Sequence, residues 1–161
     1  MRVLIELPTW LGDTVMSTPA IENLIAHYRN SEIFILGPSV SIQVFKYHPK
    51  ISETIVLDKK YFSLFKLRGR LGTFDIFFSF RGSLRSTILM FFIKSNKKYQ
   101  YQSNRFENRH QVVKYNDFIN ESLNKNFISS NLKIYKKTHQ KNENENLILG
   151  VNPGAYYGSA K

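Results

Sequence analysis

The chain has 161 residues and no cysteine, which excludes disulfides, thiolate metal sites and cysteine nucleophiles. Its length suits one well-cored domain, and an apolar fraction of 42% argues against disorder. The net charge of +11 is unevenly spread: residues 59–110 hold twelve basic and two acidic side chains, whereas residues 1–58 hold four basic and six acidic ones. This excess predicts a positive surface facing an anionic partner, such as nucleic acid, an anionic membrane, or a phosphorylated or carboxylated substrate.

Apolar patterns along the chain alternate between those typical of strands and those typical of helices. In chain order they predict strands at 2–7, 32–37, 53–58, 74–80, 97–102, 131–136 and 146–154. They predict helices at 14–29, 40–48, 61–71, 83–94 and 110–122. The alternation predicts one Rossmann-like α/β domain over residues 1–161, with a parallel sheet and helices on both faces.

Two segments depart from this simple alternation. Pro19 falls inside the first predicted helix, where a first-turn position or a kink is expected. Residues 123–146 are polar, and we interpret them as a partly mobile connection around the strand at 131–136.

The connection after the first strand, "LPTWLGDT", places Trp10, Gly12 and Asp13 at the edge where open α/β sheets bind ligands. Asp13 stands just before the predicted helix, so its side chain can be an N-cap. It can equally be a general base, which needs a carboxylate at such an edge. Gly12 would let a ligand or a backbone segment approach closely. The stretch is not G-x-G-x-x-G, so the dinucleotide fingerprint is absent.

Basic side chains follow two other predicted strands. Arg81 and Arg85 lie in "SFRGSLRS", and Lys59 and Lys60 follow the third strand. Either pair can bind a carboxylate or phosphate, or can be a solvated surface pair. His110 opens a helix and is expected to cap it or to lie in the core. The four histidines show no metal-site spacing.

The segment "NPGAYYGSAK", residues 152–161, follows the last predicted strand. Its small residues can present backbone N–H groups to a phosphate, with Lys161 as a point charge. The alternative is an ordinary turn at the end of a strand.

Two stretches, "ELPTWLGDTVMSTPAIENL" and "GVNPGAYYGSAK", resemble the ADP-heptose:lipopolysaccharide heptosyltransferases of glycosyltransferase family 9, with heptosyltransferase II as the nearest type. "FRGSLRS" matches in pattern. The resemblance implies a GT-B fold, in which two Rossmann-like domains face across a cleft. It covers the N-terminal, acceptor-binding half of such an enzyme, and the C-terminal donor domain is expected to be absent.

The resemblance also assigns roles to individual residues. Asp13 would be the catalytic base that deprotonates the acceptor sugar. The residues that would contact the acceptor are Thr9, Trp10, Leu11, Gly12, Lys59, Lys60, Arg81 and Arg85. Those that would contact the donor phosphates are Asn152, Gly154, Ser159 and Lys161. No metal or other cofactor is expected, because the inverting displacement in this family needs none.

The implied function is transfer of heptose from ADP-heptose to the anionic inner core of lipopolysaccharide. Without a donor domain, this chain is expected to be inactive alone. The implied location is cytoplasmic, peripheral at the inner face of the inner membrane. The alternative is a non-enzymatic binder of anionic glycolipid or membrane surface. Nucleic acid is not expected as a partner, because no motif that reads it is present.

Overall fold

The computed structural model describes residues 1–57, 71–106 and 108–137. Within them a five-stranded sheet has the strand order β3-β2-β1-β4-β5, and every neighbouring pair is parallel. The strands are β1 (Arg2–Glu6), β2 (Glu32–Gly37), β3 (Ile51–Val56), β4 (Thr73–Ser79) and β5 (Lys94–Gln100). The predicted parallel sheet is therefore confirmed. The order reverses between β1 and β4, and such a reversal is where open α/β sheets bind ligands.

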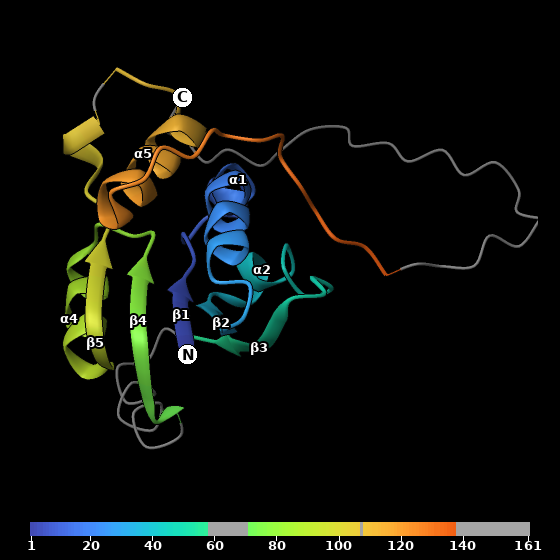
Figure 1. Ribbon diagram of the computed structural model, residues 1–161, viewed down its shortest axis with the longest axis vertical. Helices are drawn as coiled ribbons and strands as arrows, with labels where there is room; N and C mark the ends of the chain where they lie inside the picture. Colours follow the sequence, from blue (N-terminus) through green and yellow to red (C-terminus); the bar gives the residue numbers. More distant parts are fainter. Residues whose placement is uncertain (58–70, 107, 138–161) are drawn as a thin grey trace, which may run out of the picture.

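Helices cover both faces of the sheet, as the sequence predicts (Figure 1). On one face lie α1 (Leu11–His27), α5 (Gln111–Leu123) and the short α2 (Ser39–Ile42). On the other face lies α4 (Leu84–Phe92), and a 3-10 helix, η1 (Ser103–Phe106), links β5 to α5. Among the described residues no helix is long and apolar enough to cross a bilayer.

The core has two layers because successive side chains of β1 point to opposite faces. Val3 and Ile5 pack with the α1 and α5 side chains, whereas Leu4 packs with Phe77 and with Leu89 of α4. All five are essentially buried. A strand covered on both faces carries a continuous apolar run, as β1 does.

Two predicted elements differ in the structure. The helix predicted at 40–48 ends at Ile42, and the chain continues in i→i+3 turns, such as Phe45 N–H to the Ile42 carbonyl (3.0 Å). These turns replace the i→i+4 bonds of an α-helix. The strand predicted at 131–136 is wrong, because these residues pair with no strand. The helix predicted at 61–71, apart from its last residue, and the strand predicted at 146–154 lie outside the described residues.

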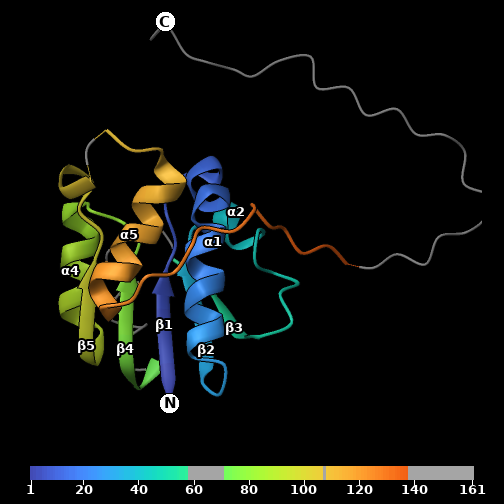
Figure 2. The same cartoon turned by 45° about the horizontal axis from the view of Figure 1, so that its top comes forward.

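The segment after α5 runs across α1 instead of joining the sheet (Figure 2). The backbone N–H of Lys133 donates to the Thr18 hydroxyl (3.1 Å), and the Tyr135 hydroxyl donates to Glu22 (3.2 Å). His48, which is almost fully buried, shares the same carboxylate through a 2.9 Å contact between its Nε2 and Glu22 Oε1. Polar bonds to the helix surface thus position this segment.

Pro19 lies in the interior of α1, so the expected first-turn position is wrong and the expected kink stays a prediction. A proline has no N–H to donate, which leaves the carbonyl of Val15 without its helical partner. The hydroxyl of Thr18 donates to that carbonyl (2.7 Å). A side chain therefore supplies the bond that the proline removes.

We expect Thr18→Val to lower the free energy of unfolding by about 1–3 kcal/mol, because two partly buried backbone groups, the Val15 carbonyl and the Lys133 N–H, lose their partner. Thr87→Val is the control: the Thr87 hydroxyl bonds the carbonyl of Ser83, the N-cap of α4, and the side chain of Gln100, all on the exposed side of the helix. Water can replace these exposed bonds, so the control should change stability by less than about 0.5 kcal/mol. Urea denaturation measures both, and equal losses would contradict this account of Pro19.

Candidate active site

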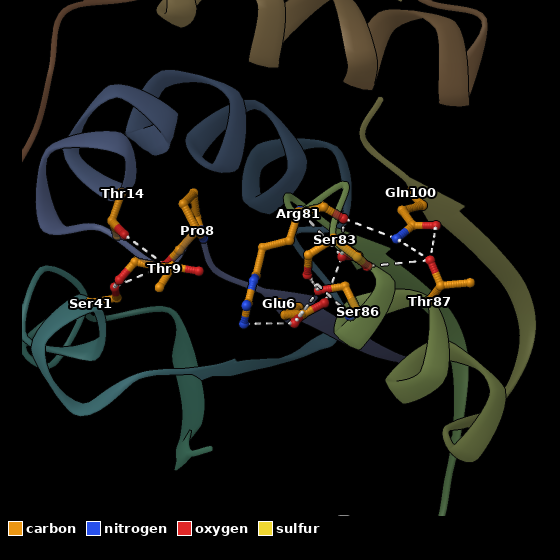
Figure 3. Close-up of polar contacts among 11 residues, drawn as sticks. Glu6, Pro8, Thr9, Thr14, Ser41, Arg81, Ser83, Ser86, Thr87 and Gln100 are labelled. Carbon is orange, nitrogen blue, oxygen red and sulfur yellow. Dashed lines mark hydrogen bonds and ion pairs between the residues drawn. The ribbon is translucent and has the colours of Figure 1, made fainter. Parts of the chain in front are cut away.

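The loop that follows β1 is fixed by hydroxyl groups from two helices (Figure 3). The Ser41 hydroxyl of α2 donates to the carbonyl of Pro8 (2.9 Å), and it lies 3.3 Å from the carbonyl of Thr9. From the other side, the Thr14 hydroxyl of α1 lies 3.3 Å from the Pro8 carbonyl. This bracing fixes the point at which α1 begins.

Asp13 is the third residue of α1, and the N-cap is Trp10, whose side chain makes no capping bond. The interpretation of Asp13 as an N-cap is therefore wrong. Its carboxylate still lies in the first turn, where the unpaired N–H groups of the helix stabilise negative charge. Asp13 is partly exposed, so solvent or a ligand can reach it. A carboxylate free of a capping role is available for acid–base chemistry.

Beneath this loop, β1 ends in a carboxylate that is completely buried, Glu6. Two hydroxyls donate to it, that of Ser79 (2.6 Å) and that of Ser86 (2.8 Å), and Arg81 Nη1 donates at 3.3 Å (Figure 3). Glu6 and Ser79 lie opposite each other in the register of β1 and β4, so the pairing of these strands places the Ser79 hydroxyl next to the Glu6 carboxylate. The three donors lie on β4, on the loop after it and on α4. Glu6 therefore connects the end of β1 to β4, to the loop after β4 and to α4.

The loop after β4 is held as firmly as the loop after β1. Gln100, the last residue of β5, donates its side-chain N–H to the carbonyl of Arg81 (3.1 Å). At Gly82 a Cβ atom would lie 3.0 Å from the Tyr101 carbonyl, so only glycine fits without a shift. The side chain of Arg81 is only 14% exposed. The interpretation of Arg81 as a solvated surface residue is therefore wrong.

Burial raises the pKa of the Glu6 carboxyl above its ordinary value of 4.5, although Ser79, Ser86 and Arg81 oppose that shift. A carboxyl with a raised folded pKa stabilises the fold most when protonated, and this contribution is lost as pH rises through the folded value. We expect the unfolding free energy of the wild type, relative to Glu6→Gln, to fall as pH rises above 4.5. Urea denaturation at a series of pH values measures this difference. If the unfolding free energy of the wild type relative to Glu6→Gln instead rises with pH, Arg81 stabilises the ionised Glu6 carboxylate more than burial destabilises it.

A shallow hollow of about 200 Å³ opens where the loops after β1 and β4 meet. It is lined by Pro8, Thr9, Trp10, Asp13, Phe80, Arg81, Gly82, Ser83, Tyr101 and Tyr115. The hollow thus brings Asp13 and Arg81 to the point where the strand order reverses. Trp10 forms an exposed wall, with 73% of its surface accessible. The arrangement can bind a polar ligand at Asp13.

The predicted site residues fall into four groups. Those that line the hollow are Thr9, Trp10, Asp13 and Arg81. Leu11 and Gly12 lie exposed on the first turn of α1, where a Cβ at Gly12 would meet no protein atom. Arg85 lies on α4, and its charge acts on Glu6. Those that lie outside the described residues are Lys59, Lys60, Asn152, Gly154, Ser159 and Lys161.

Glu6, Tyr101 and Tyr115 are among the residues of the site that the sequence did not predict. Glu6 stands at the end of an apolar strand, and an acid in such a run was the available signal. Tyr101 and Tyr115 follow core periodicity, and they are indeed almost fully buried. Nothing in the sequence showed that both border the hollow.

Other features of the described residues offer less chemistry. His110 caps α5 by accepting from the Val112 N–H (3.4 Å), as expected. Larger hollows of about 440 and 470 Å³ border α5, but their charged walls include the paired groups Arg105–Glu121 and Arg109–Asp117. Across residues 1–57, 71–106 and 108–137, no three acidic or histidine side chains gather as a metal site.

Two curated relatives, from Campylobacter jejuni serotypes O:2 and O:6, match this chain over its whole length. Both are lipooligosaccharide heptosyltransferase 2, and they are 38% and 37% identical to it over 167 aligned residues. The chain is homologous to heptosyltransferases. The resemblance inferred from the sequence is thus confirmed. Each alignment covers 100% of this chain but 52% of the relative, so the chain spans about half the length of these heptosyltransferases. No family model matches it.

Solved structures share the fold of this heptosyltransferase homologue. The glycosyl transferase family 9 protein from Veillonella parvula gives a TM-score of 0.71 at 22% identity, over 83% of this chain and 44% of that one. The E. coli heptosyltransferase WaaC with ADP-2-deoxy-2-fluoro heptose gives 0.67 at 17% identity, over 82% of this chain and 51% of that one. At these identities the likeness concerns the fold. The predicted fold class, a Rossmann-like α/β sheet of GT-B type, is confirmed.

Proposed function

We propose that this chain is the acceptor-binding half of a heptosyltransferase that transfers heptose from ADP-heptose to the inner core of lipopolysaccharide. The observation that carries the proposal is the position of Asp13. This residue is partly exposed and lines the hollow where the strand order reverses, in a chain that is homologous to heptosyltransferases. A general base for a sugar hydroxyl needs such a reachable carboxylate. Location at the inner face of the inner membrane is part of the same proposal.

The proposed chemistry is a direct, inverting displacement. Asp13 accepts the proton of an acceptor hydroxyl as its oxygen attacks the anomeric carbon of heptose. The bond from that carbon to the β-phosphate oxygen breaks, and ADP leaves with the electron pair. Arg81, which lines the hollow and pairs with Glu6 beneath it, is proposed to add positive charge on the acceptor side. Lys161 is proposed to offset charge on the departing ADP, and the reaction is proposed to need no metal.

A chimera tests the proposal: this chain replaces the matching half of the Campylobacter jejuni O:2 relative. The chimera should transfer heptose from ADP-heptose to an inner-core acceptor, whereas this chain alone should show no transfer. Release of ADP and mass spectrometry of the acceptor measure both. A folded chimera without activity, or turnover by the chain alone, would refute the proposal.

A second candidate function is non-enzymatic binding of an anionic glycolipid or membrane surface. It is favoured by the twelve basic and two acidic residues in 59–110. The two functions differ in their dependence on Asp13, because simple anion binding should not need that carboxylate.

A further inference from the structure

Two tyrosines form the inner wall of the hollow beside Asp13. Tyr101 follows β5 and Tyr115 belongs to α5, so the fold brings them together from separate elements. They are only 5% and 3% exposed, and their ring centroids lie 4.9 Å apart. Both line the same hollow as Asp13.

The hydrogen bond between Gln111 and Tyr101 defines what the Tyr101 hydroxyl can do. Gln111 Nε2 donates to the Tyr101 hydroxyl oxygen at 3.1 Å. A phenol that accepts such a bond keeps its own proton for another partner. Gln111 thereby orients Tyr101 and leaves it a donor.

The charge state of both phenols agrees with this role. Burial, together with the negative charge of Asp13, raises the pKa of Tyr101 and of Tyr115, although Gln111 opposes both shifts. Both hydroxyls therefore keep their protons at physiological pH. The hollow then offers one carboxylate that accepts hydrogen bonds and two phenols that donate them.

Such a combination of groups is complementary to a polyol. Each sugar hydroxyl can donate one hydrogen bond and accept others. A hydroxyl that donates to Asp13 can accept from a phenol on the same or the neighbouring carbon. We propose that Tyr101 and Tyr115 bind the acceptor sugar by donating hydrogen bonds to its oxygens, and so direct its reacting hydroxyl toward Asp13. This inference rests on the proposed function.

Removal of each phenolic oxygen tests the inference. An inner-core oligosaccharide bearing Kdo and heptose is titrated into the chain, and binding is followed through Trp10, the only tryptophan. Tyr101→Phe and Tyr115→Phe should each weaken binding about tenfold, which corresponds to about 1.4 kcal/mol. The control is Tyr28→Phe, because Tyr28 is a partly buried tyrosine at the opposite end of α1, away from the hollow. It should bind as tightly as the wild type.

A second readout separates ligand binding from a purely structural effect. In the chimera, both variants should raise KM for the acceptor more than they lower kcat, with thermal midpoints close to that of the parent. Unchanged affinity and KM in both variants, while the wild type binds the oligosaccharide, would overturn this inference and leave the proposed function intact. The inference would also be overturned if Tyr28→Phe weakened oligosaccharide binding as much as Tyr101→Phe and Tyr115→Phe do. Failure of the folded wild-type chain and of the chimera to bind the oligosaccharide would overturn both.

Discussion

Asp13→Asn should lower heptose transfer by the chimera by about 10²- to 10⁴-fold, the range that general base catalysis supplies. An asparagine has nearly the same size as an aspartate and can occupy the same position in the first turn of α1. It cannot accept the proton of the acceptor hydroxyl. The loss should therefore appear in kcat, measured as ADP release, while the affinity for the acceptor changes little.

Asp117→Asn provides the control for Asp13→Asn. Asp117 lies on α5, where its carboxylate pairs with Arg109 at 2.7 Å and does not line the hollow. This variant should keep the activity of the parent chimera. If Asp13→Asn also retained full activity, Asp13 could not be the base, and non-enzymatic binding would become the better account of this half.

Glu6→Ala should lower the free energy of unfolding by about 3–5 kcal/mol. The substitution leaves the largely buried Arg81 guanidinium without its carboxylate, and the hydroxyls of Ser79 and Ser86 lose an acceptor. It also opens space under both loops of the hollow. Urea denaturation at neutral pH measures the loss. Trp10 fluorescence should report a rearranged loop in the variant that remains folded.

Glu32→Ala is the comparison for Glu6→Ala. Glu32 also pairs with an arginine, since its Oε2 lies 3.7 Å from Arg2 Nε, but its side chain is 63% exposed. Exposed ion pairs contribute about 0–1 kcal/mol, so this variant should be nearly neutral. If Glu6→Ala and Glu32→Ala lowered the free energy of unfolding by the same amount, the burial of Glu6 would not explain the contribution of its contacts.

The sequence predicted the sheet well because its strands are covered on both faces. In a chain that alternates strands with helices, a continuous apolar run such as that of β1 is typical of a buried parallel strand. Short polar segments gave poorer predictions. The alternation of Leu132 and Ile134 with Lys133 and Tyr135 suggested a strand, yet the two apolar side chains are more than half exposed. Their polar neighbours instead contact α1, which periodicity alone cannot reveal.

The candidate site was predicted only where it follows directly from position along the chain. Asp13 and Arg81 come just after strands, so topology places them at the ligand-binding edge. Glu6 was missed because its role depends on a register partner 73 residues away, Ser79. Tyr101 and Tyr115 were missed because their rings belong to the core, and only the folded structure shows that they also border the hollow.

The most direct test of the acceptor-binding assignment is a pair of titrations watched through Trp10, which is 73% exposed at the wall of the hollow. The inner-core oligosaccharide bearing Kdo and heptose is added to one sample of the chain, and ADP-heptose to another. We predict that the oligosaccharide shifts the Trp10 emission to saturation and that the nucleotide sugar does not. A shift with ADP-heptose alone would contradict the assignment, because the hollow would then belong to the donor.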